Sequence, residues 1–202
     1  PRRDNVYDLY TDPEKIDDET FAQALTSFKT KLAVFTAPPE ILPLDILSGD
    51  DIHKILLAAQ LAYDFVIVDM PTWLAEWSST VLQMAETYFT IMELDMRSAQ
   101  NTMRFLRALK AEELPDEKLQ FALNYAPSFT DLNGKARARR FSESLGIDIN
   151  IFLPDGGKQV AQTCDQGAPL AEGAPKNPLR KEIRKIAASL ISMAEEQKAA
   201  IA

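Results

Sequence analysis

The stretch "YDFVIVDMPTWLAEW", from Tyr63 to Trp77, decides how the fold of this chain is interpreted. Its apolar run, Phe65 to Val68, ends at Asp69, and a proline follows two positions later. A buried strand of a parallel sheet has this appearance, because helices cover both of its faces. An aspartate at the tip of such a strand can hold Mg²⁺ beside the phosphates of a nucleotide. The alternative is an aspartate that only caps the next helix.

Short apolar runs and helix-like segments alternate along the whole chain. The apolar runs, which are continuous rather than alternating, predict strands at residues 32–36, 65–69, 88–92, 119–125 and 147–155. Helical spacing of apolar residues predicts helices at 11–28, 47–62, 77–86, 98–112, 134–146, 158–172 and 177–197. This order is typical of an α/β doubly wound fold with a mostly parallel sheet, here in one domain over residues 1–202.

Ligands of such sheets bind outside the carboxyl ends of the strands, so the polar residues there are the candidates for function. Besides Asp69, they are Asp95, Asn124, and the pair Pro154 and Asp155. The amide of Asn124 carries both donors and an acceptor, which suits the edge of an adenine ring. A turn residue bonded to its own backbone is the alternative. The glycines after Asp155 permit close approach to a ligand, or serve only the turn.

Composition excludes several classes of function. The 202 residues carry a formal charge of −8, which argues against broad affinity for nucleic acid or an anionic membrane. A single cysteine, Cys164, and a single histidine, His53, rule out an internal disulfide and a Cys/His zinc site, as suits a reducing cytoplasm. We expect His53 on a helix surface and Cys164 in local packing. No apolar run approaches the roughly 18 residues of a transmembrane helix, so we expect no stable membrane insertion.

The sequence contains no phosphate-binding loop of the form G-x-x-x-x-G-K-[ST]. Gly134-Lys135 is followed by Ala136 and has no glycine at the required spacing before it. This pair opens a basic cluster, Lys135 to Arg140, which we expect to be a solvated helix face, with contact to an anionic partner as the alternative.

The last helix has an apolar stripe opposite a basic face. The stripe consists of Leu179, Ile183, Ile186 and Leu190. A helix of this kind packs on a sheet or lies on a membrane surface, and the stripe lacks the aromatic anchor that membrane helices favour. We therefore expect it to pack on the sheet.

The order of the segments resembles the MinD/ParA group of P-loop ATPases and, within it, the CpaE/TadZ proteins of Tad (Flp) pilus assembly. The most specific likeness lies in "YDFVIVDMPTWLAEWSSTVLQMAE", where a Walker B-type strand is followed by Asp, Pro and two tryptophans. Three further segments resemble family motifs and follow in the family's order: "KLAVFTAPPEI", "LNYAP" and "IFLPDGGKQVAQTCDQGAPLAEGAPKNPL". The likeness extends from Val6 to about Leu190.

The resemblance implies ATP and Mg²⁺ as cofactors of the full-length protein. Asp69 would be the catalytic Walker B-type acid beside Mg²⁺, Asn124 would contact adenine, and Pro154 and Asp155 would line the adenine pocket. It also implies that residues 1–202 are the C-terminal two-thirds of an ATPase-like domain. The Walker A lysines, and in many members a receiver-like domain, would lie upstream, and these residues alone would bind ATP weakly or not at all.

By resemblance, the first hypothesis for function is a cytoplasmic localisation factor for pilus assembly, recruited to a cell pole. It would form a homodimer with ATP at the interface, bind other Tad/Flp assembly proteins, and hydrolyse ATP slowly if at all. A non-catalytic scaffold with a degenerate nucleotide site is the second hypothesis. The third is a ParA/MinD-like partitioning ATPase, which the net charge disfavours. For Trp73 and Trp77 we expect packing within the domain, with a dimer contact as the alternative.

Overall fold

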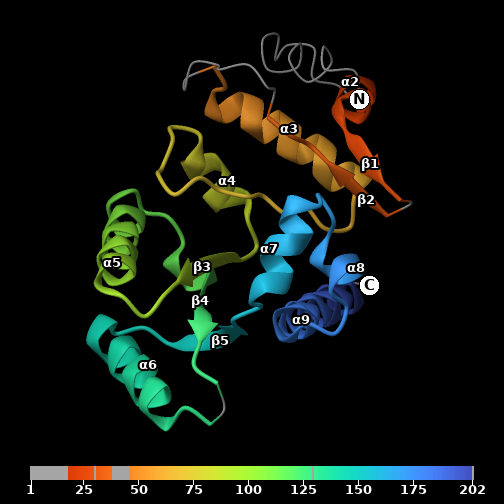
Figure 1. The fold of residues 1–202 in the computed structure, drawn as a ribbon. Coiled ribbons are helices and arrows are strands. Elements are labelled where there is room, and N and C mark those ends of the chain that lie inside the picture. Colours follow the sequence, from red (N-terminus) through yellow and green to blue (C-terminus); the bar gives the residue numbers. More distant parts are fainter. Residues whose placement is uncertain (1–17, 30, 38–45, 129, 202) are drawn as a thin grey trace. The chain divides into compact units, whose positions relative to one another are not determined.

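The computed structural model describes residues 18–29, 31–37, 46–128 and 130–201 (Figure 1). The chain falls into two compact units. The first runs to Glu86 and includes Glu112–Pro115, and the second holds Thr87–Ala111 and Asp116–Ala202. The assignment of all residues to one domain stays a prediction.

The first unit combines helices with a two-stranded antiparallel sheet. Its elements are α2 (Asp18–Ala24), β1 (Thr26–Phe28), β2 (Leu32–Val34), α3 (Gly49–Ala62) and α4 (Ser78–Met84). The helix expected to reach residue 28 ends at Ala24, and its predicted part before residue 18 lies outside the described residues. Thr26–Phe28 instead pairs with Leu32–Val34, because β-branched and aromatic residues favour a strand when a partner lies beside them.

Helix α3 forms where the sequence predicts it, because its start is fixed by a capping box. The Ser48 hydroxyl accepts a hydrogen bond from the backbone N–H of Asp51, and the Asp51 carboxylate accepts one from the Ser48 N–H. The helix buries Ile55 and its neighbours against Phe21, whose ring centroid lies 5.8 Å from that of Phe35. This cluster is the core of the first unit.

Residues 65–68 do not form the predicted buried strand. They have neither helical nor strand structure, and all four side chains are exposed, with Ile67 at 91%. The apolar run identified a segment suited to a strand, but no described strand of the chain is hydrogen-bonded to it. A strand needs a neighbour for its backbone N–H and C=O groups, so the run alone does not make one.

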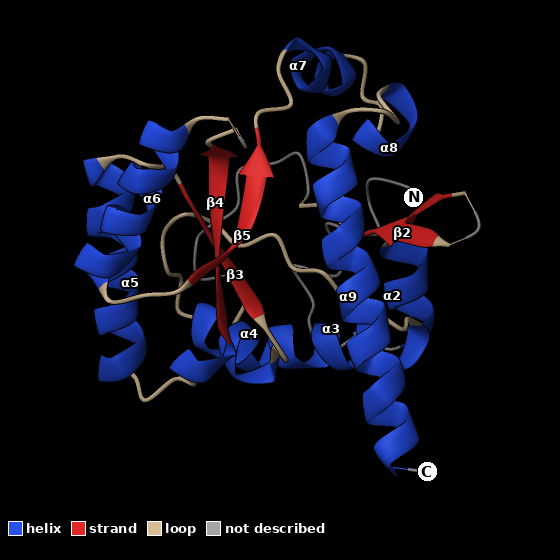
Figure 2. Cartoon of the chain, turned by 90° about the horizontal axis from the view of Figure 1, so that it is seen from below, coloured by secondary structure: helices blue, strands red, loops and turns tan. Residues whose placement is uncertain are grey.

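The second unit is the doubly wound part of the fold. Its elements, in order, are β3 (Tyr88–Met92), α5 (Met96–Ala111), the short helix η2 (Asp116–Lys118), β4 (Leu119–Ala126), α6 (Leu132–Leu145), β5 (Ile149–Pro154), α7 (Lys158–Asp165), α8 (Leu170–Gly173) and α9 (Pro178–Ile201). The three strands are parallel in the order β3-β4-β5. Figure 2 shows α5 and α6 on one face of this sheet and α9 on the other. The predicted α/β class with a parallel sheet is confirmed.

The central strand β4 carries the core of this unit. Ala122 and Leu123 are almost fully buried, as are Met92 on β3 and Leu109 on α5. The predicted continuous apolar strand is therefore correct here, because helices cover both faces. Helix α6 ends, as expected, at Gly146, whose φ of 64° gives the left-handed cap.

The apolar stripe of α9 differs in part from the prediction. Leu179, Ile186 and Leu190 are half-buried, and the helix packs along β5. Ile183 is 47% exposed, because it lies next to the packed stripe on the helix surface rather than within it. No helix in the described part of the chain is long and apolar enough to cross a membrane.

Candidate functional site

The three parallel strands end side by side, which brings their following residues to one edge of the sheet. Met92, Leu123 and Phe152 are in register across β3, β4 and β5. The residues that follow Met92 and Leu123 are Glu93 and Asn124. The register therefore places a carboxylate and an amide at neighbouring strand ends, at the edge where ligands of α/β sheets bind.

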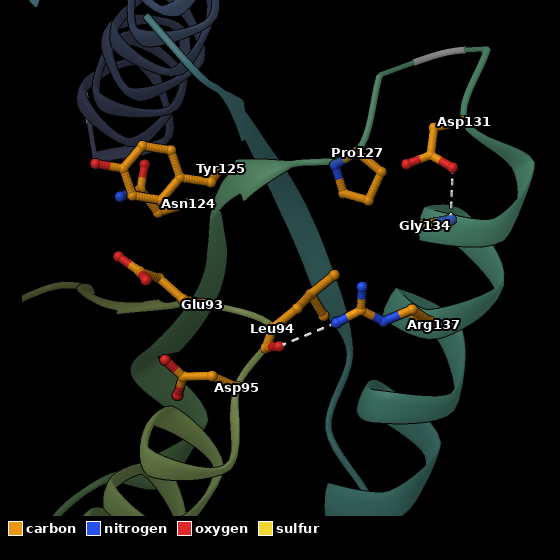
Figure 3. Close-up of a pocket in the computed structure, with 9 residues that line it drawn as sticks. All are labelled: Glu93, Leu94, Asp95, Asn124, Tyr125, Pro127, Asp131, Gly134 and Arg137. Atoms are coloured by element: carbon orange, nitrogen blue, oxygen red, sulfur yellow. Dashed lines mark hydrogen bonds between the residues drawn. The ribbon is translucent and has the colours of Figure 1, made fainter. Parts of the chain in front are cut away.

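A β-bulge at the end of β4 changes where its side chains project. Leu123 pairs with Phe152 and Ala126 with Pro154, so Asn124 and Tyr125 together lie opposite the single residue 153. Tyr125 has a φ of 49°, a left-handed conformation that costs a non-glycine residue about 1–2 kcal/mol. Successive strand residues normally point to opposite faces, whereas Figure 3 shows the Asn124 and Tyr125 side chains projecting to the same side.

A pocket of about 250 Å³ lies at this edge of the second unit (Figure 3). Its lining comes from the loop after β3, the end of β4 and the start of α6, and comprises Glu93, Leu94, Asp95, Asn124, Tyr125, Pro127, Asp131, Gly134 and Arg137. The predicted residue Asn124 is part of it. Pro154 and Asp155 are not part of this lining.

The wall formed by the loop after β3 is held by two hydrogen bonds to Ser98. The Ser98 backbone N–H donates to the Asp95 carboxylate at 2.7 Å, and the Ser98 hydroxyl accepts from the Glu93 N–H at 3.1 Å. The hydrogen bond from the Ser98 N–H holds the pKa of Asp95 below its ordinary value. The positive charge of Arg97, whose Nη2 lies 3.8 Å from the Asp95 Oδ2, also lowers it. Asp95 therefore caps α5 and stays ionised at neutral pH.

The opposite wall is the first part of α6. Asp131 caps this helix by accepting from the Gly134 N–H at 2.8 Å. A turn later, the Arg137 guanidinium donates to the Leu94 carbonyl oxygen at 3.4 Å and so reaches across to the loop after β3. Arg137 belongs to the predicted basic cluster, whose cations Lys135, Arg139 and Arg140 are also exposed, as expected for a solvated face.

The Pro154–Gly157 turn is not part of this pocket lining and is held by its own hydrogen bonds. The Asp155 carboxylate accepts from the Gly157 N–H at 2.7 Å, which stabilises the turn that this stretch predicts. Asn177, only 2% exposed, donates through Nδ2 to the Gly156 carbonyl at 2.8 Å and to Gln159 Oε1 at 3.0 Å. This buried amide fixes the turn against the start of α9.

Asp69 belongs to the first unit, and its carboxylate is exposed at the end of residues 65–68, which pair with no described strand. Among the described residues no group of three or more His, Cys, Asp or Glu side chains is arranged to hold a metal ion. A lone exposed carboxylate still fits Mg²⁺, which keeps several waters and takes one or two carboxylates beside substrate phosphates.

The two tryptophans after Asp69 differ in burial. Trp73 is 49% exposed, contrary to the expected packing, and Trp77 is half-buried just before α4.

Other sequence predictions have mixed outcomes. His53 lies exposed on α3, as expected. Cys164 is exposed rather than packed, because the buried face of α7 is occupied by Thr163 instead. The sequence did not identify Glu93, Tyr125 or Asn177. The first two depend on strand register and a bulge, whereas Asn177 before a proline and a helical pattern is a recognisable helix cap.

The fold resembles two solved ATPases. The structure of a ParA family ATPase from Chlorobium tepidum TLS matches with a TM-score of 0.77 and 18% identity, over 87% of this chain and 72% of that one. The cell division ATPase MinD of Pyrococcus furiosus matches with a TM-score of 0.57 and 15% identity, over 90% and 75%. No family model and no curated protein matches the sequence. At these identities the likeness concerns the fold alone, and the chain therefore has an α/β fold like that of the ParA family ATPase and of MinD.

Proposed function

We propose that the chain is part of a MinD/ParA-like, ATPase-type localisation factor for Tad/Flp pilus assembly, which binds ATP at a dimer interface in the full-length protein. Both structural neighbours are ATPases. The pilus role rests on the resemblance of the Tyr63–Trp77 segment and its two tryptophans to CpaE/TadZ proteins. The factor would act in the cytoplasm at a cell pole, together with other pilus assembly proteins.

The observation that carries the nucleotide part is Asn124 at the carboxyl end of a central parallel strand. Its amide has no hydrogen-bond partner among the described residues, and it lies in the pocket at the sheet edge. A free amide offers a donor and an acceptor side by side, which matches the amino group and ring nitrogen of adenine. Pro154 and Asp155, at the end of the adjacent strand, are the further residues proposed to line the base.

Asp69 is the residue proposed to hold Mg²⁺ and to stand near the attacking water. When bound, Mg²⁺ would neutralise charge that develops on the transferred phosphoryl group. The exposed Asp69 carboxylate is a hard oxygen ligand, as this ion prefers. Any hydrolysis would be slow, as suits a factor whose nucleotide state controls assembly rather than supplies metabolic flux.

ATP binding by the full-length protein tests the proposal. Asn124→Ala should weaken Mg²⁺-ATP binding about tenfold, the size of two lost neutral hydrogen bonds. The matched control is Asn101→Ala, which removes an exposed amide from α5 and should leave affinity unchanged. Asp69→Ala should abolish the effect of Mg²⁺ on ATP affinity. It should also abolish any ATP hydrolysis. Unchanged isothermal titrations for both Asn124→Ala and Asp69→Ala would show that neither residue serves a nucleotide.

A non-catalytic scaffold with a degenerate nucleotide site is the second candidate, and it is favoured by the exposed position of Asp69 after a segment that pairs with no described strand. The scaffold would localise to the pole without binding ATP. Imaging of a tagged full-length protein in its source cells, beside the Asp69→Ala variant, separates the two. Polar foci that persist in that variant identify the scaffold, and foci that disperse identify a nucleotide-dependent factor. Tight, salt-sensitive DNA binding would instead identify a partitioning ATPase.

A further inference from the structure

We propose that the pocket at the ends of β3 and β4 receives an arginine side chain of a partner polypeptide, held between the Glu93 carboxylate and the Tyr125 ring. The proposal rests on the second unit alone and does not require nucleotide. Because Asn124 lines the same pocket, adenine bound there would compete with the arginine. Figure 3 shows both side chains projecting to the same side of the two strand ends. One supplies a charged acceptor and the other a flat aromatic surface.

The charges that line the pocket favour a cation. The lining contains three carboxylates, those of Glu93, Asp95 and Asp131, and a single guanidinium, that of Arg137. Asp95 and Asp131 are engaged as helix caps, and Arg137 donates to the Leu94 carbonyl. The Glu93 carboxylate has neither a hydrogen bond nor an ion pair with any described residue. Among the described residues it is thus the carboxylate of this pocket that lacks a donor, and an anionic group placed beside it would meet a surplus of negative charge.

The geometry favours the guanidinium of arginine over other cations. Among the described residues no group of three or more His, Cys, Asp or Glu side chains is arranged for a metal ion. The Tyr125 side chain is 59% exposed, so its ring is open to a planar group. A guanidinium matches a carboxylate through two parallel hydrogen bonds and stacks on an aromatic face, whereas a lysine ammonium does neither as well.

The backbone supports a function for Tyr125 at this position. The bulge holds Tyr125 in a left-handed conformation and turns its ring to the same side as Asn124. Strained residues of this kind persist where the surrounding structure holds them, and they gather at binding sites. The Leu94 carbonyl already accepts from Arg137, which shows that the loop after β3 can bind a guanidinium.

The test is a chemical-shift titration of the ¹⁵N-labelled 202-residue chain with N-acetyl-arginine-N′-methylamide. Saturable shifts should appear at Glu93, Asn124 and Tyr125 with a Kd of roughly 1–10 mM, as expected for so small a ligand. The capped citrulline analogue, which is planar but neutral, should bind at least several-fold more weakly, and so should capped lysine. Free L-arginine should bind no more tightly than the capped form, because the proposed ligand is a side chain within a polypeptide.

Two pocket variants and one matched control complete the experiment. Glu93→Gln should weaken binding of the capped arginine about five-fold, as for a solvent-screened ion pair. Tyr125→Asn removes the ring but suits the left-handed backbone, and it should weaken binding about three-fold. Asp148→Asn removes one exposed carboxylate before β5, at the opposite end of the sheet, and should have no effect. Equal binding of arginine and citrulline, tighter binding of free arginine, or an effect of Asp148→Asn equal to that of Glu93→Gln would overturn the proposal.

Discussion

Replacement of Asn177 by alanine should destabilise the second unit by about 2–4 kcal/mol. The amide makes three hydrogen bonds: it donates to the Gly156 carbonyl at 2.8 Å and to Gln159 Oε1 at 3.0 Å, and it accepts from the Leu179 N–H at 3.0 Å. Each contributes about 0.5–1.5 kcal/mol net, and loss of a helix cap alone costs about 1 kcal/mol. Since Asn177 is only 2% exposed, water does not readily replace these bonds.

Two further variants divide this effect into its parts. Asn177→Ser keeps a cap acceptor for the Leu179 N–H but is too short to reach Gly156, so it should recover about 1 kcal/mol relative to alanine. Gln159→Ala removes one of the three bonds and should cost about 0.5–1 kcal/mol.

The free energies follow from urea unfolding, and hydrogen exchange gives the local readout. The Leu179 amide should exchange faster in Asn177→Ala and keep its protection in Asn177→Ser, because only the serine retains an acceptor. An alanine variant within about 0.5 kcal/mol of the wild type, with unchanged exchange at Leu179, would refute this account of the turn.

Other consequences concern the pocket walls and a helix end. Gly134→Ala should lose about 1–3 kcal/mol in thermal unfolding despite better helix propensity, because the new Cβ would lie 2.6 Å from Pro127 Cβ. Gly146→Ala has open space around its Cβ and should lose only about 1 kcal/mol, from its φ of 64°. The Ser98 N–H lowers the pKa of Asp95 from 3.8, so the stability that this carboxylate adds is present above that pH and is lost as the pH falls through the lower folded value. Acid unfolding of Asp95→Asn should therefore be less steep below pH 4 than that of the wild type.

Local signals in the sequence predicted much of the second unit. The apolar run of residues 88–92 became β3 with the same bounds, and Gly146 ends α6 as its position suggested. The alternation of strands and helices predicts a parallel sheet, and a parallel sheet places Asn124 at the edge formed by the carboxyl ends of the strands. These features depend on neighbours in sequence, which a single chain displays directly.

The remaining features depend on pairing between distant segments. Glu93 lies next to Asn124 only because Met92 and Leu123 are in register, and no pattern in either segment records that register. The turn of Tyr125 toward the pocket results from a bulge against residue 153. The same limit explains why the sequence predicts a helix over Thr26–Phe28, since the strand found there depends on the pairing with Leu32–Val34.

Residues 65–68 show most clearly what a run of apolar residues can and cannot specify. They resemble β3 in composition, yet β3 is a strand because β4 lies beside it, while residues 65–68 have no paired strand among those described. Burial follows the same division: Met92 on β3 is 2% exposed and Ile67 is 91% exposed. The role proposed for Asp69 requires it at a fixed strand tip, because Mg²⁺ demands near-ideal placement of its few protein ligands. The chemistry of Asp69 is thus determined by whether residues 65–68 acquire a strand neighbour, and only secondarily by the carboxylate itself.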